Sequence, residues 1–130
     1  MSGCRNLLWV DSMGGLAVGV AMFALAGPLS GLYGIGEGFL LLMGGANLAY
    51  GLYSLTLASR RRRPRVALYL LVAANVFWGA LCLRWAAVTW GDATWLGTAH
   101  FVLEGLYVGG LGIVEWRCRD ALLGHADPAL

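Results

Sequence analysis

Four long apolar segments constrain the fold of this chain more than any other feature of its sequence. They cover residues 7–26, 38–58, 66–88 and 95–116. A helix rises about 1.5 Å per residue and the hydrocarbon core of a bilayer is about 30 Å thick, so each segment is long enough to cross that core. The loops between the segments are short and leave no room for a soluble catalytic domain. We therefore expect an all-α membrane protein in which residues 1–130 form a single domain, a four-transmembrane-helix bundle.

The composition agrees with a lipid environment. Hydrophobic residues make up 59% of the chain and charged residues 12%, whereas a soluble domain carries about 25% charged residues. This leaves too little polar surface to coat a water-soluble globule. The composition disfavours intrinsic disorder and a nucleic-acid-binding surface. The first expected partner is the lipid bilayer, and no nucleic acid is expected.

The distribution of arginine predicts the orientation. With four spans, the N-terminus, the second loop and the C-terminus lie on one side of the membrane, and the arginines next to the spans all fall there: Arg5, Arg60, Arg61, Arg62, Arg63, Arg65, Arg117 and Arg119. The opposite loops carry only Glu37 and Asp92. By the positive-inside rule, both termini are predicted to be cytoplasmic. We interpret the run at residues 60–65 as a topology determinant, with a lipid-headgroup or nucleic-acid site as the alternative.

The two ends of the chain need separate interpretation. Arg5, the apolar stretch after it and the Ala-x-Ala pattern at 24–26 imitate a signal peptide, but Asp11 inside that stretch argues against cleavage. Residues 117–130 are predicted to be a flexible cytoplasmic tail. Nine basic residues, all arginine, beside abundant alanine, glycine and leucine indicate a GC-rich bacterial genome. The expected location is therefore the bacterial inner membrane.

Cysteine and histidine give mainly negative indications. The chain has three cysteines, an odd number, at Cys4, Cys82 and Cys118. No two have Cys-x-x-Cys spacing, and two lie on the side of the membrane that is predicted to be reducing. We expect them to be small apolar fillers with no disulfide framework. Only His100 lies inside a span, and we find no nucleotide-binding glycine fingerprint or nucleophile elbow. No metal site and no cofactor are predicted.

Glycine is expected to mediate helix packing. Gly15 with Gly19, and Gly105 with Gly109, have the Gly-x-x-x-Gly spacing that lets membrane helices approach closely. The spacing does not say whether these faces meet within one chain or between chains. We expect a homo-oligomer or a membrane-protein partner.

A short internal repeat is the most specific signal. Residues 46–55 align with residues 74–83, and four of the ten positions are identical. Each copy has an asparagine, Asn47 or Asn75, followed at i+3 by an aromatic residue, Tyr50 or Trp78. A polar group in hydrocarbon needs a hydrogen-bond partner. The asparagines either clamp the two helices together by pairing, worth about 0.6–2 kcal/mol, or line a pocket.

Acidic residues mark a possible polar path along the fourth span. Glu104 lies near its middle, where an ionised acid costs about 2.5–3.5 kcal/mol to insert. His100 is one turn away and Glu115 three turns away, and Asp11 is expected opposite Glu115 at the inner edge. Alternatively, Glu104 holds the helices together by bonding an asparagine. Arg84 either extends outward to the membrane surface or pairs with Glu104.

Three functions are compatible with these residues. The first is a protein that binds or transports a proton, a cation or a small amphiphilic solute. Its candidate site residues are Glu104, His100, Asn47, Asn75, Arg84, Tyr50 and Trp78, with Asp11 and Glu115 at the inner edge. The alternative is a non-catalytic accessory or assembly subunit of a larger membrane complex. A lipid-substrate enzyme using His100 and Glu104 as an acid/base pair is less favoured, so the sequence favours a non-enzymatic role without deciding it.

Overall fold

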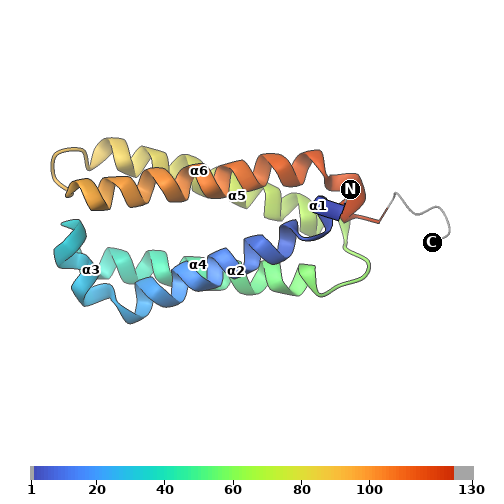
Figure 1. Cartoon of the computed structure of the whole chain (residues 1–130), viewed down its shortest axis with the longest axis horizontal. Helices are drawn as coiled ribbons and strands as arrows, with labels where there is room; N and C mark the ends of the chain where they lie inside the picture. The colour runs from blue at the N-terminus through green and yellow to red at the C-terminus, as the bar shows by residue number, and fades with distance from the viewer. Residues whose placement is uncertain (1, 125–130) are drawn as a thin grey trace.

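The computed structural model describes residues 2–124, and every regular element in this part of the chain is a helix (Figure 1). The helices are α1 (Ser2–Arg5), α2 (Leu7–Ala24), α3 (Ala26–Tyr33), α4 (Glu37–Ala58), α5 (Arg65–Val88), α6 (Trp95–Arg117) and α7 (Arg119–Leu122). Four of them, α2, α4, α5 and α6, are long and apolar enough to cross a membrane. Each lies within a few residues of a segment predicted from the sequence.

Local sequence signals fix several helix boundaries. Gly36 has an extended backbone immediately before α4, and Pro64 does the same before α5. The hydroxyl of Thr94 accepts a hydrogen bond from the backbone N–H of Gly97 and so caps the start of α6. Gly34 ends α3 in the left-handed region, with φ 67°, a conformation that suits glycine because it lacks a Cβ. The turns are therefore encoded locally.

Two segments expected to be irregular are partly helical. The first loop contains α3, in whose first turn Pro28 lies, where a missing N–H costs no intrahelical bond. The tail expected at 117–130 begins with the end of α6 and with α7, and buries Leu122 and Leu123. These leucines pack against the bundle, which explains why this part is ordered. Residues 125–130 of the predicted tail lie outside the described residues.

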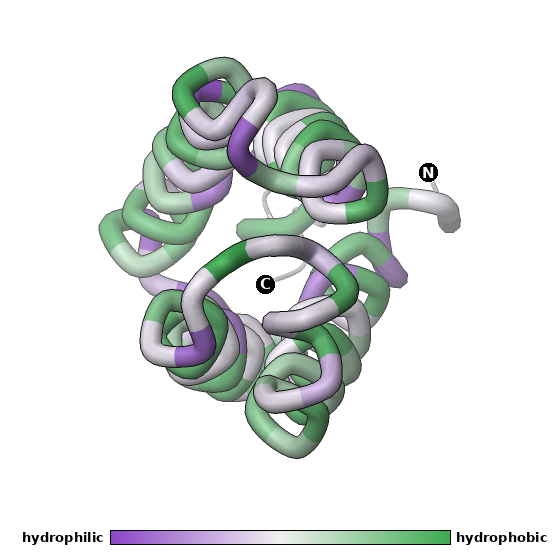
Figure 2. The backbone as a smooth tube through the Cα atoms, turned by 90° about the vertical axis from the view of Figure 1, so that its left-hand side faces the viewer, coloured by the Kyte–Doolittle hydropathy of each residue, from purple (hydrophilic) through white to green (hydrophobic). Residues whose placement is uncertain are grey.

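The long helices form two antiparallel hairpins. Helix α2 packs along α4, and α5 packs along α6, whereas contacts between the hairpins are sparse. The view along the bundle shows the two pairs facing each other (Figure 2). Glycine allows the close approach within each pair: a Cβ on Gly51 would lie 2.8 Å from the backbone nitrogen of Leu16, and one on Gly79 would lie 2.8 Å from the Cα of Gly109. Both Gly-x-x-x-Gly faces therefore pack within the chain.

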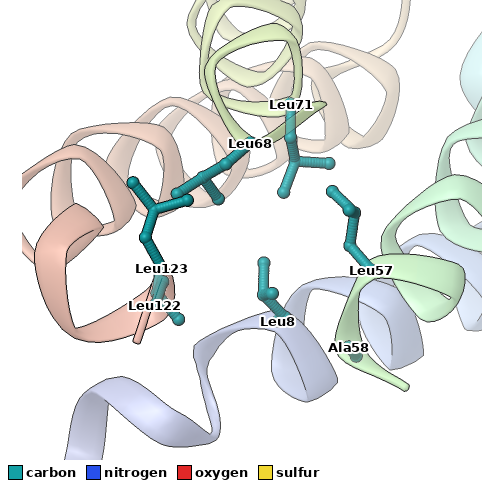
Figure 3. Close-up of a cluster of buried hydrophobic side chains, with 7 residues drawn as sticks. All are labelled: Leu8, Leu57, Ala58, Leu68, Leu71, Leu122 and Leu123. Atoms are coloured by element: carbon teal, nitrogen blue, oxygen red, sulfur yellow. The ribbon is translucent and has the colours of Figure 1, made fainter. Parts of the chain in front are cut away.

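Apolar clusters close the two ends of the bundle. At the end where α1, α7 and the α4–α5 loop meet, which we call the arginine-rich end, apolar side chains from α2, α4, α5 and α7 and from the residue after α7 converge (Figure 3). The cluster consists of Leu8, Leu57, Ala58, Leu68, Leu71, Leu122 and Leu123. Arg63 covers it by donating to the carbonyls of Leu57, Ala58 and Leu122. A second cluster around Met22, Leu40, Met43 and Phe101 closes the opposite end.

The cysteine expectation was wrong for two of the three residues. Cys4 and Cys118 form a disulfide that joins α1 to the end of α6. Their Cα atoms lie 5.8 Å apart, within the range that a disulfide spans. The pairing depends on the bundle bringing residues 114 positions apart to one end, which cysteine spacing does not reveal. Cys82 is free and buried, as expected.

Candidate functional site

A cavity of about 650 Å³ lies between the two hairpins. This is within the size range typical of small-molecule sites, about 300–1,000 Å³. Its walls are mostly apolar, with small residues of α2 and aliphatic and aromatic residues of α5 and α6. Polar groups from all four long helices reach it: Asp11, Asn47, Tyr50, Asn75, Trp78, His100, Glu104 and Tyr107. All but one of the predicted candidates near the middle of the bundle are therefore brought together.

Glu104 is the centre of one polar cluster. Glu104 is only 7% exposed, and both of its carboxylate oxygens are hydrogen-bonded. Oε2 accepts from Trp78 Nε1 at 2.6 Å and from Asn47 Nδ2 at 3.4 Å. Oε1 lies 2.9 Å from His100 Nε2, one helical turn away. These donors stabilise a carboxylate in an otherwise apolar region.

Tyr33 extends this cluster beyond the cavity. Its hydroxyl lies 3.1 Å from His100 Nδ1. Burial, and to a lesser degree the charge of Glu104, raises the pKa of Tyr33 above 10.0. The phenol therefore keeps its proton, and in the tautomer in which it donates to Nδ1, the Nε2–H of His100 donates to Glu104. The chain Tyr33–His100–Glu104 is a polar connection from α3 to the middle of the bundle.

Asp11 is the centre of a second cluster, nearer the arginine-rich end. Asp11 is 2% exposed. Its Oδ2 accepts from the Tyr50 hydroxyl at 2.6 Å and from Asn75 Nδ2 at 3.0 Å. The same Asn75 nitrogen also donates to Glu115 Oε1 at 3.0 Å. Asp11 and Glu115 therefore meet at one asparagine. Glu115 itself does not line the cavity.

The internal repeat has a structural meaning that the sequence did not reveal. Asn47 and Asn75 do not pair with each other; each bonds a different acid. Asp11 accepts from Tyr50 of its own hairpin and from Asn75 of the other hairpin. Glu104 likewise accepts from Trp78 of its own hairpin and from Asn47 of the other. Thus the two acids are held in equivalent ways, and the hydrogen bonds join hairpins that otherwise make few contacts.

Several predicted residues lie elsewhere. Arg84 is exposed, does not line the cavity and has no hydrogen bond to Glu104 in the part of the chain that is described. Arg60, Arg61, Arg62 and Arg65 are exposed at the arginine-rich end. Arg63 differs from them because its guanidinium binds backbone carbonyls, and burial lowers its pKa.

Tyr107 was absent from the predicted site residues. It lines the cavity, and its hydroxyl donates to the Val10 carbonyl at 3.2 Å, linking α6 to α2. Its position three residues after Glu104 places both on one helix face, which is the sequence signal that could have identified it.

A scan against protein-family models, curated proteins and solved structures finds no match to this chain. The site is therefore interpreted from its own geometry.

Proposed function

We propose that this chain is a multi-pass protein of the bacterial cytoplasmic membrane, with both termini in the cytoplasm. Four helices of sufficient length and apolarity support insertion. The arginine-rich end supports the orientation, because positively charged loops remain on the cytoplasmic side. Helices α1 and α7, the first and last that the structure describes, lie at this end together with the α4–α5 loop (Figure 1).

We further propose that the cavity binds a small amphiphilic solute with a cationic or hydrogen-donating head. The observation that carries this proposal is the combination of mostly apolar walls with two buried carboxyl groups, Asp11 and Glu104. Among the described lining residues, His100 is the only basic side chain. Trp78 and Tyr50 add aromatic faces that attract cations.

The solute is expected to enter from the bilayer. Contacts between the hairpins are sparse along both seams, α2 with α6 and α4 with α5. The cavity also includes Phe77 and Leu103, which are 64% and 67% exposed on the outer surface of the bundle. A solute dissolved in lipid therefore reaches the cavity sideways between the hairpins. Movement of the hairpins against each other would convert such binding into transport.

The test is titration of the purified protein in mild detergent with tetraphenylphosphonium, an apolar cation, monitored by calorimetry. We expect Glu104→Gln to weaken binding at least tenfold, equivalent to about 1.4 kcal/mol, because it removes a charge and little volume. Glu37→Gln is the matched control, since Glu37 is exposed at the start of α4, and it should bind as the wild type does. Absence of wild-type binding, or equal affinity in Glu104→Gln, would contradict the proposal.

The alternative of an accessory subunit is less supported than solute binding. The glycine faces that were candidates for docking are occupied within the chain, by Gly51 and Gly79 among others. An enzymatic role is also less supported, because no serine, threonine, cysteine or lysine is among the described residues that line the cavity. The native mass of the protein in mild detergent distinguishes solute binding from an accessory role. A stoichiometric foreign chain would favour the accessory role.

A further inference from the structure

The layer between the cavity and the leucine cluster of the arginine-rich end contains two acids in close proximity. Asp11 is 2% exposed and Glu115 is 0% exposed. Both accept from the single nitrogen Asn75 Nδ2, each at 3.0 Å. Their carboxyl oxygens therefore lie within two hydrogen-bond lengths of each other. On the far side, Leu8 and Leu71, each within one turn of this layer along its helix, exclude water.

Every group that faces this pair is neutral or acidic. From α4, the Tyr50 hydroxyl donates to Asp11, and from α5 the Asn75 amide donates to both acids. From α6, Tyr107 donates to the Val10 carbonyl next to Asp11. Within the described part of the chain, neither acid has an ion pair with an arginine or histidine. Two negative charges would thus share a buried site with no compensating cation among the described residues.

Electrostatic repulsion determines how many protons such a pair of carboxyl groups holds. Two carboxylates that share a buried site repel each other, so one of them retains a proton and the two titrate as a unit. Asp11 has the better environment for a charge, because one of its oxygens accepts two hydrogen bonds, from Tyr50 and Asn75. Glu115 accepts one and lies in the last turn of α6, where the helix dipole disfavours a negative charge.

Two unpartnered atoms point to the same site independently. Glu115 Oε2 and Asn75 Oδ1 are fully buried and lack a hydrogen-bond partner among the described residues. An ionised oxygen in this position would be unstabilised, whereas a protonated Oε2 carries no charge. We propose that Asp11, Asn75 and Glu115 form a proton-binding site that holds one proton on Glu115 Oε2 beside an ionised Asp11.

This site is distinct from the Glu104 cluster but communicates with the cavity. Asp11 and Asn75 line the cavity and Glu115 lies behind them. A cation that approaches Asp11 from the cavity neutralises the charge beside which Glu115 is held. Coupling between solute binding and the proton rests on the proposed function, whereas the proton site itself does not.

The test is infrared spectroscopy of the purified protein in detergent across a pH series, without added solute. We expect the carbonyl stretch of a protonated carboxyl group near neutral pH, which Glu115→Gln abolishes. Asp11→Asn should retain the band but lower the pH at which it disappears, because the neighbouring charge is gone. Glu37→Gln, at an exposed acid, should leave the band unchanged.

Isotope labelling keeps the test valid if Glu115→Gln does not fold, which circular dichroism would reveal. Wild-type protein with ¹³C-labelled glutamate should show a shifted band, and protein with ¹³C-labelled aspartate should not. Absence of the band near neutral pH, a band that survives in folded Glu115→Gln, or a shift with labelled aspartate would overturn the proposal. Tetraphenylphosphonium is then added separately: failure to release the proton would count against the coupling alone.

Discussion

The substitution Gly79→Ala tests the close packing that creates the hairpins and thereby the cavity. A Cβ at this position would lie 2.8 Å from Gly109 Cα and 2.9 Å from Gly105 O, both backbone atoms. Backbone cannot move aside as a flexible side chain does, so α5 and α6 must separate. Ordinary carbon contacts begin at about 3.5 Å, so the interface must open by roughly 0.7 Å.

The expected energy follows from two opposing effects. Overpacking of a close interface costs about 1–3 kcal/mol. Replacing glycine by alanine in a helix returns about 0.5–1 kcal/mol. The net loss of stability is therefore about 0–2.5 kcal/mol, with a central value of about 1 kcal/mol. Gly110→Ala is the matched control, since a Cβ on Gly110 meets nothing within 4 Å, and it should be as stable as the wild type or slightly more so.

The assay is unfolding in mixed micelles with increasing dodecyl sulfate, followed by circular dichroism and tryptophan fluorescence. Gly79→Ala should unfold at a lower detergent fraction than Gly110→Ala, by a difference of about 2 kcal/mol. Since Trp78 is adjacent to Gly79 and bonds Glu104, its fluorescence should also change. Equal stability of the two variants would refute the assignment of Gly79 to the helix contact.

Two further predictions concern the arginine-rich end. Arg63→Ala removes hydrogen bonds to three backbone carbonyls of α4 and α7. It should lower the free energy of unfolding by about 1.5–3 kcal/mol and speed hydrogen exchange in α7. Arg62→Ala, at an exposed position, should change neither quantity, and equal effects of the two variants would contradict this role of Arg63. After reduction in intact cells, an impermeant thiol reagent should not label Cys4 or Cys118 but should label Ala93→Cys in the opposite loop. The reverse labelling would show that the proposed orientation is wrong.

Sequence reasoning identified most of the residues at the site but not their partners. Asn47, Asn75 and Glu104 were identifiable because a polar group in an apolar segment is costly wherever the helix packs. That Asn75 bonds Asp11 and Glu115, rather than Asn47, depends on the axial register and rotation of α5 against its neighbours. Those quantities are set by contacts such as Gly79 against Gly109, which no single segment encodes.

The sequence by itself determined the four long helices and their limits, because apolar length, glycine and proline act locally along the chain. The tertiary structure alone decided that the helices form two glycine-packed hairpins, that a cavity separates them, and that Cys4 reaches Cys118. It also decided that Asp11 and Glu104 each accept hydrogen bonds from both hairpins. These features depend on which helix faces meet, and that is settled by close packing of the whole bundle rather than by any segment of it.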